Sequence, residues 1–136
     1  MTAEIRIYNP GTLGTPLGQY SHISRARASE YLFIAGMVAS DKTGAIIGKD
    51  DFDAQARQVF DNVRAALESA GASFRNVVQF TTYLVDPRLI EKFMAFRKRE
   101  FPGMFAGAPY PPNTLLIIHQ LVRKEFLIEV QTVAAI

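Results

Sequence analysis

The sequence predicts a single α+β domain, residues 1–136, in which two helices pack on one face of a mixed β-sheet. Two observations support this fold class. Short β-favouring apolar runs flank and separate two longer segments with helical periodicity, in the order ββ-α-β-α-ββ. The predicted strands also carry apolar residues for both faces of the sheet, although two helices can cover only one face. We therefore expect the uncovered face to pack against other copies of the chain.

The composition is that of an ordinary globular domain, with 49% hydrophobic and 21% charged residues. Fifteen basic and 13 acidic residues give a net charge of +2, which is too balanced to predict a nucleic-acid partner. The chain has no cysteine and two histidines, so we expect neither a metal nor a cofactor. No signal pattern or membrane-length apolar run is present, and we expect a cytoplasmic protein without a membrane partner.

The N-terminal third predicts strands separated by a loop rich in glycine and proline. Residues 4–8 form a short strand, and dense turn-forming residues exclude regular structure up to Gly18. Residues 25–28 can begin a second strand, and residues 31–38 form a strong one that Gly36 interrupts. A glycine inside a strand indicates a bulge or the close approach of another group to the backbone.

Two segments have the apolar spacing of amphipathic helices. Residues 51–70 form the clearer one, with Asp50 or Asp51 to cap its start and Gly71 where it ends. After a strand at residues 77–85, a second helix spans residues 88–101, and Pro102-Gly103 is expected to end it. On this helix the predicted inner residues are Ile90, Phe93, Met94 and Phe101, and the predicted solvated residues include Arg97, Lys98 and Arg99.

The C-terminal part contains one residue that does not fit a buried strand. A stiff proline-rich connector leads into two apolar runs, residues 115–118 and 126–133, joined by a charged bend. Such runs are typical of strands that are buried on both faces. Glu129 interrupts the second run and either reaches solvent at a sheet edge or sits in a polar pocket, because an unpaired buried charge is strongly unfavourable.

Five segments together carry a family pattern. They are GQYSH (18–22), LFIAG (32–36), DFDAQARQVFDN (51–62), VVQFTTYLVD (77–86) and LIEVQTVA (127–134). In this order and spacing the sequence resembles the Rid family of reactive intermediate deaminases, also called YjgF and, in older usage, translation inhibitor or L-PSP endoribonuclease. The resemblance covers nearly the whole chain.

The resemblance implies a YjgF-like fold similar to that of the trimeric chorismate mutases, and a homotrimer with ligand clefts between subunits. Typical members hydrolyse enamines and imines that pyridoxal-phosphate enzymes release, giving a 2-oxo acid and ammonia. An arginine after the proline-rich connector holds the substrate carboxylate through two parallel hydrogen bonds. A glutamate on the last strand orients or activates the attacking water.

Transferred residue by residue, the family's site is only partly kept. Glu129 stands at the position of the glutamate and Tyr20 at that of the tyrosine, and Gly36 keeps the glycine whose backbone lines the cleft. The arginine is absent, because Asn113 occupies its position. The resemblance therefore assigns the catalytic role to Glu129.

Three further polar positions of the family are apolar in this chain. Ala35 replaces the usual serine, Met37 replaces a glutamine, and Met94 replaces an asparagine of the second helix. The expected ligand-binding residues are Tyr20, Ala35, Gly36, Met37, Met94, Asn113 and Leu115.

These replacements predict a less acidic and more apolar ligand than the usual imino acids. Asn113 can donate a hydrogen bond but cannot neutralise a carboxylate, and a charged hydrogen bond is worth about 1.5–3 kcal/mol. Desolvation in an apolar cleft should raise the pKa of Glu129, which suits general acid or base chemistry.

Three functions are compatible with these residues. The chain is a divergent hydrolase of an imine, enamine or related metabolite, or a non-catalytic trimer that binds a small metabolite. An endoribonuclease or translation inhibitor is less favoured, because the sequence lacks a basic stripe interleaved with exposed aromatic residues.

Overall fold

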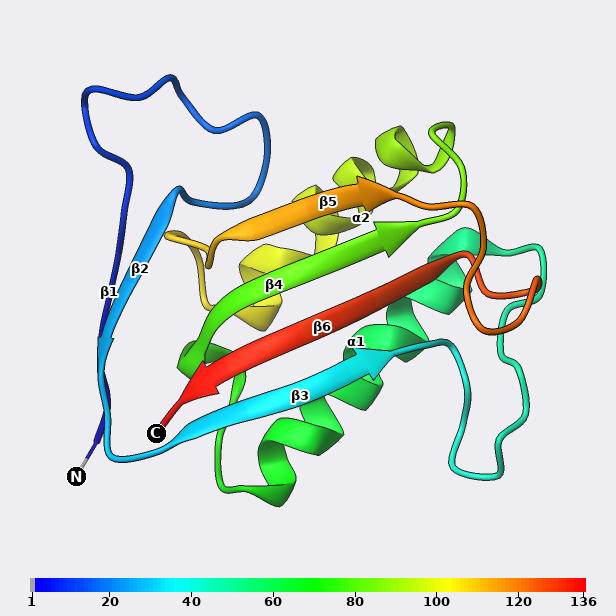
Figure 1. The fold of residues 1–136 in the computed structure, drawn as a ribbon, viewed down its shortest axis with the longest axis horizontal. Coiled ribbons are helices and arrows are strands. Elements are labelled where there is room, and N and C mark those ends of the chain that lie inside the picture. Colours follow the sequence, from blue (N-terminus) through cyan, green and yellow to red (C-terminus); the bar gives the residue numbers. More distant parts are fainter. Residues whose placement is uncertain (1) are drawn as a thin grey trace.

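The computed structural model describes residues 2–136 as a four-stranded mixed sheet, with two helices on one face and a two-stranded hairpin at one end (Figure 1). The strand order in the larger sheet is β3-β6-β4-β5. The elements are β1 (Glu4–Tyr8), β2 (Ile23–Arg27), β3 (Tyr31–Met37), α1 (Phe52–Ser69), the 3-10 turn η1 (Phe74–Asn76), β4 (Val77–Leu84), α2 (Leu89–Met104), β5 (Asn113–Ile117) and β6 (Ile128–Ala135). The predicted α+β class and the placement of both helices on one face are confirmed.

The C-terminal strand lies inside the sheet rather than at its edge. β6 pairs antiparallel with β3 and β4, whereas β5 pairs in parallel with β4 on the far side. Helix α2 provides the crossover between the parallel strands β4 and β5 (Figure 1). The last two strands are therefore not neighbours, and a loop from residue 118 to residue 127 carries the chain past β4.

The expectation that residues 115–118 form a strand buried on both faces is wrong within one chain. β5 ends at Ile117 and is an edge strand, and the Leu116 and Ile117 side chains are each 40% exposed. His119 is exposed in the following loop rather than part of the strand. Leu116 is in register with Tyr83 on the open face and has no cover, because both helices lie on the other face (Figure 1). Ile117 is in register with buried Leu84 and is exposed at the end of the edge strand.

The first helix follows the sequence prediction closely. Asp51 caps α1 by accepting a hydrogen bond from the Ala54 amide at 3.1 Å, and Gly71 adopts a φ of 72° just after the helix. Its buried stripe packs on the sheet through aromatic contacts. Phe60 lies edge-on to Phe80 of β4, with ring centroids 5.8 Å apart, and stacks on Phe96 of α2 at 5.7 Å.

The second helix differs from the prediction in two ways. α2 continues through Pro102-Gly103 to Met104, so the proline sits in the last turn, and the Phe105 amide still bonds to the Phe101 carbonyl at 2.9 Å. Arg97 is not solvated, since it is only 3% exposed, whereas Lys98 and Arg99 are exposed as predicted. No helix within residues 2–136 is both long and apolar enough to cross a membrane.

A buried glutamine of α1 fixes the start of β6. The Gln55 side chain is fully buried and donates to the carbonyls of Gly48 at 3.2 Å and Glu125 at 2.8 Å. Its Oε1 accepts from the Leu127 amide at 2.8 Å. These bonds tie the helix to the segment that leads directly into Glu129.

We predict that Gln55→Met lowers the free energy of unfolding by about 2–4 kcal/mol, because it leaves several buried backbone groups without partners. Gln58→Met is the matched control on the same helix. Gln58 bonds only to Asn62 at 2.9 Å, one turn away, so its loss should cost at most about 0.5 kcal/mol. Denaturant titration at equal protein concentration measures both values, and equal losses would contradict the role of Gln55.

Candidate functional site

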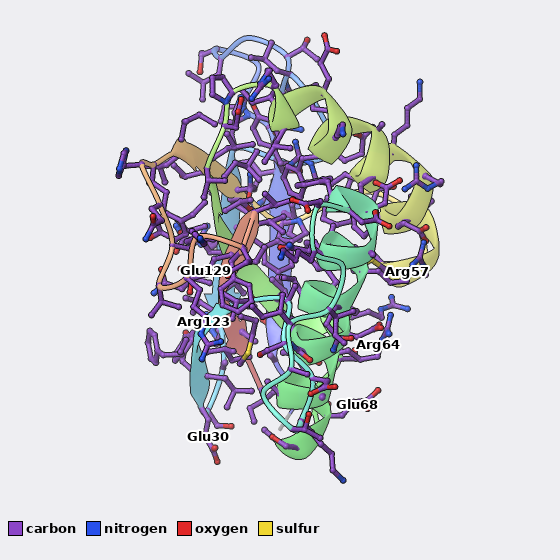
Figure 2. All side chains as sticks on the ribbon, turned by 90° about the vertical axis from the view of Figure 1, so that its right-hand side faces the viewer. Glu30, Arg57, Arg64, Glu68, Arg123 and Glu129 are labelled. Carbon is purple, nitrogen blue, oxygen red and sulfur yellow. The ribbon has the colours of Figure 1, made fainter. Side chains whose placement is uncertain are left out.

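Glu129 lies on the face of the sheet that the helices leave open. Side chains of β6 alternate, so that Ile128 and Val130 are buried under the helices while Glu129 stands on the opposite side, paired in register with Tyr83 of β4. Figure 2 shows Glu129 on the side of the molecule away from Arg57, Arg64 and Glu68 of α1. Glu129 is half-buried, although no helix covers it.

The partial burial of Glu129 depends on a bulge in β3 that contains Gly36. Ile34 pairs with Thr132 and Met37 with Val130, so Ala35 and Gly36 together oppose one residue of β6. A Cβ at position 36 would lie 2.6 Å from Glu129 Cδ, closer than real Cβ contacts allow. The carboxyl group therefore rests on the β3 backbone where a side chain is missing. Both features expected of a strand glycine, a bulge and a close approach, are present.

The Glu129 carboxyl has no charged partner within residues 2–136. It forms no ion pair and accepts no hydrogen bond from any described residue. Burial raises its pKa above the ordinary 4.5, because the ionised form loses solvation that nothing replaces. A half-buried, unpaired carboxyl of this kind can bind a proton, a water molecule or a ligand donor.

Asn113 and Leu115 lie on the covered face, opposite to Glu129. Asn113 pairs in register with Phe80 and Leu115 with Thr82, and both of those β4 residues are buried beneath the helices. The Thr82 hydroxyl donates to Asn113 Oδ1 at 2.7 Å, so the amide nitrogen of Asn113 is directed elsewhere. Within one chain the sheet itself separates Asn113 from Glu129.

Tyr20 and Met94 belong to a third location, where the loop of residues 9–22 covers α2. A Cβ at Gly18 would lie 3.5 Å from Met94 Cε, and the Tyr20 ring centroid is 5.9 Å from the guanidinium carbon of Arg97. The Tyr20 hydroxyl accepts a hydrogen bond from the Leu17 amide at 3.2 Å, which closes the loop into a tight turn. This cluster lies on the α2 side of the molecule.

One chain therefore brings together only part of the predicted site. Ala35, Gly36 and Glu129 meet on the open face. Met37 does not join them, because it pairs with buried Val130 and packs against the core on the covered side. The other predicted residues, Tyr20, Met94, Asn113 and Leu115, are on the covered side or on α2.

Sequence reasoning missed Arg97 as a buried residue. Its spacing could have found it, because it stands four residues after Phe93 and four before Phe101, on the inner stripe of α2. Its charge led to the solvated assignment. Across residues 2–136, no group of three or more His, Cys, Asp or Glu side chains gathers to hold a metal ion.

Comparison with known proteins places this geometry in a family. A family model described as Endoribonuclease L-PSP matches residues 12–136. A RutC family protein of Pyrococcus horikoshii is 36% identical over 120 residues, 88% of each chain, and the RutC family protein YjgH of Escherichia coli is 29% identical over 113 residues, 82% of each chain.

Solved structures agree with these sequence matches. The crystal structure of YyfB from Yersinia pestis, described as a protein of unknown function of the conserved Rid protein family, has a TM-score of 0.86 at 30% identity. It covers 97% of this chain and 98% of its own. RidA from the Antarctic bacterium Psychrobacter has a TM-score of 0.66 at 28% identity over 90% of this chain and 92% of its own.

We predict that the Glu129 carboxyl titrates with a midpoint above 4.5 in carboxyl-detected NMR. Gly36→Ala should move the midpoint back toward 4.5, because the new Cβ displaces the carboxyl from the β3 backbone into solvent. Gly103→Ala is the control, since a Cβ there meets nothing within 4 Å. An unchanged midpoint in Gly36→Ala would contradict the contact.

The same pKa shift predicts how stability depends on pH. The folded state holds the Glu129 proton more tightly than the unfolded state, so ionisation opposes folding. The free energy of unfolding should therefore lose this contribution as pH rises from about 4.5 through the folded pKa. Glu129→Gln should remove that part of the pH dependence, and a wild-type slope in the variant would show that another group causes it.

Proposed function

Because this chain belongs to the Rid (YjgF, L-PSP endoribonuclease) family, we propose that it forms a homotrimer through the open face of its sheet and binds a small metabolite between subunits. We further propose that it hydrolyses an imine or enamine of low acidity there. The observation that carries the proposal is the half-buried, unpaired carboxyl of Glu129 resting on Gly36, on a sheet face that no helix covers.

The proposed reaction needs a single proton acceptor. Glu129 accepts a proton from water as the water oxygen adds to the carbon of the protonated C=N bond, giving a neutral carbinolamine. The carboxyl then returns this proton to the nitrogen. As the C–N bond breaks, the carboxylate accepts the hydroxyl proton, a carbonyl compound and ammonia leave, and the carboxyl passes the proton on to ammonia or water. A raised pKa supports both halves of this cycle, because it lets the same group gain and lose a proton near neutral pH more readily than an ordinary glutamate.

The residues around the proposed cleft support a substrate of low acidity. Asn113 supplies an amide where typical members have the carboxylate-binding arginine, and Ala35 and Met94 replace polar residues of the family pattern. Within the described chain, no lysine or arginine side chain forms a hydrogen bond or an ion pair with Glu129 or Asn113.

Self-association is supported by apolar side chains on the open face. Phe33 of β3 is 80% exposed, and Tyr31 and Leu116 are 47% and 40% exposed. Phe33 pairs across the strands with half-buried Val133 of β6, so the exposed apolar surface continues over more than one strand. A second copy packed there would remove this surface from water.

A non-catalytic trimer that binds a small metabolite is the second candidate. It is favoured by the same replacements, because three polar positions of the family pattern have become Ala35, Met37 and Met94. RNA cleavage has less support, although the matching family model bears the endoribonuclease name. Of the basic run on α2, Arg97 is buried and Arg99 lies 3.4 Å from carboxylates of both Asp53 and Glu100.

Sedimentation velocity should give a trimer for the wild-type protein at micromolar concentration. Phe33→Glu should shift the boundary toward monomer, because it places an uncompensated charge in the proposed interface. Leu13→Glu, at a 53% exposed position in the loop of residues 9–22, should remain trimeric. A stable wild-type monomer would refute the proposed assembly.

Ammonia release from freshly generated imines tests the proposed reaction. We expect no acceleration with 2-iminobutanoate and clear acceleration with an apolar imine that lacks a carboxylate. Glu129→Gln should reduce the latter rate by roughly 10²–10⁴-fold, the usual effect of losing a general base. Glu30→Gln, at an exposed position, is the control.

Rapid turnover of 2-iminobutanoate would show that the arginine is dispensable. Binding of the apolar imine without ammonia release, in both the wild type and Glu129→Gln, would favour the non-catalytic trimer.

A further inference from the structure

The β1-β2 hairpin presents three arginines on one face. Because side chains alternate along a strand, Arg25 and Arg27 of β2 point to the same side. Arg6 of β1 pairs directly with Arg25 in the register and therefore shares that side. All three arginines are exposed, whereas Ile5 and Ile7 on the other side of β1 are half-buried. Arg6, Arg25 and Arg27 together form the arginine face of the hairpin.

The arginine face has no neutralising partner within residues 2–136. None of its three side chains forms an ion pair or a hydrogen bond. Glu4, opposite Arg27, is the one carboxylate in the two strands, so three positive charges and one negative charge leave +2, which equals the net charge of the whole chain. Like charges directly opposite each other destabilise a hairpin, and Arg6 and Arg25 stand in this relation. A bound anion would relieve this repulsion.

Two tyrosine rings flank the arginine face. The guanidinium carbon of Arg6 lies 4.8 Å from the ring centroid of Tyr8, two residues along β1. Tyr31, at the start of β3, donates a hydrogen bond from its hydroxyl to the Ala26 carbonyl at 3.4 Å. A hollow of about 760 Å³ lies against this part of the hairpin, and this volume is in the range of small-molecule sites. Its lining consists of residues 4–6, residues 25–28 and Tyr31.

We propose that the arginine face binds a small ligand that carries a di- or triphosphate group. A guanidinium donates two parallel N–H groups to the oxygens of one phosphate, so several arginines side by side suit linked phosphates. Two or more negative charges on the ligand match the +2 charge of the face, whereas a single carboxylate would neutralise only half of it. A nucleic-acid strand needs cations along many phosphates, and this face provides three on strands of five residues.

This site goes beyond the proposed hydrolysis and does not depend on it. The hairpin lies at one end of the sheet, and β6 runs from Glu129 at the other end to Ala135, which pairs with Tyr31 beside the hairpin (Figure 1). On the side of the hairpin opposite to the arginines, the Ser24 hydroxyl donates to the Val78 carbonyl of β4 and so attaches the hairpin to the sheet. Phosphate binding and imine hydrolysis can therefore be measured separately.

Calorimetry with inorganic pyrophosphate tests the proposal, with orthophosphate and acetate as comparison anions at constant ionic strength. Pyrophosphate should bind the wild type and raise its unfolding midpoint, and the comparison anions should bind at least about tenfold more weakly. Arg25→Gln should lose at least about tenfold in affinity for pyrophosphate, consistent with the loss of a charged hydrogen bond. Arg25→Lys should also bind more weakly than the wild type, because a lysine keeps the charge but lacks the planar fork.

Matched variants separate the arginine face from general effects of charge. Arg123→Gln removes an exposed arginine in the loop of residues 118–127 that forms no ion pair within the described chain, and it should bind pyrophosphate like the wild type. Glu129→Gln should also keep the response. Glu4→Gln should bind pyrophosphate more tightly, because it removes the one negative charge of the two strands. Without ligand, Arg25→Gln should unfold at the wild-type temperature or above, since it removes a like-charge pair.

Absence of pyrophosphate binding in the wild type, or an unchanged affinity in Arg25→Gln, would overturn the proposal. Equal affinity of the wild type for orthophosphate and pyrophosphate would also overturn it. Tighter binding of a short oligothymidylate than of pyrophosphate, lost in Arg25→Gln, would identify a nucleic-acid surface instead. A changed sedimentation coefficient or a markedly lower unfolding midpoint of ligand-free Arg25→Gln would contradict the proposal too, because it would mean that another copy of the chain already covers the arginines.

Discussion

Two helices can cover only one face of a four-stranded sheet, and the other features of the molecule follow from this constraint. α1 and α2 cover the face of the sheet that carries Phe80, where Phe60 of α1 packs on the Phe80 ring. On the opposite face, Phe33 and Leu116 remain in contact with water (Figure 1). Glu129 can occupy a strand at the centre of the sheet only because that strand has an open face. The same asymmetry places Asn113 on the far side of the sheet from Glu129.

Two ionisable groups without ion-pair partners, half-buried Glu129 and buried Arg97, lie on opposite sides of this sheet. Glu129 rests on the backbone of Gly36, and Arg97 lies beneath Gly18. In each case a glycine provides the space for the charged group, which is half-buried at Glu129 and almost fully buried at Arg97. Groups in such positions are common where a protein binds or transforms a ligand. The open face, which carries Glu129, is therefore a candidate for recognition within one chain.

Local sequence patterns predicted the helices and most strands, because capping, periodicity and β-propensity act over a few residues. Asp51 and Gly71 bounded α1 correctly, and Gly36 correctly indicated a bulge. Patterns could not predict that β6 lies between β3 and β4, or that β5 is an edge strand, since strand order depends on contacts distant in sequence. Arg97 was assigned to the solvent by its charge, although its spacing placed it on the buried stripe. Family resemblance supplied the positions of Glu129 and Asn113 but not their separation by the sheet.

In the proposed assembly a complete cleft requires two copies of the chain, and because the sequence has no cysteine, introduced cysteines can test this directly by cross-linking. Asn113→Cys and Glu129→Cys proteins are mixed, allowed to exchange subunits, and treated with a short bis-maleimide. We expect covalent dimers only in the mixture, and linked species up to a trimer when one chain carries both substitutions. Intramolecular cross-linking within a monomeric double variant, or no cross-linking in the mixture despite subunit exchange, would contradict the account.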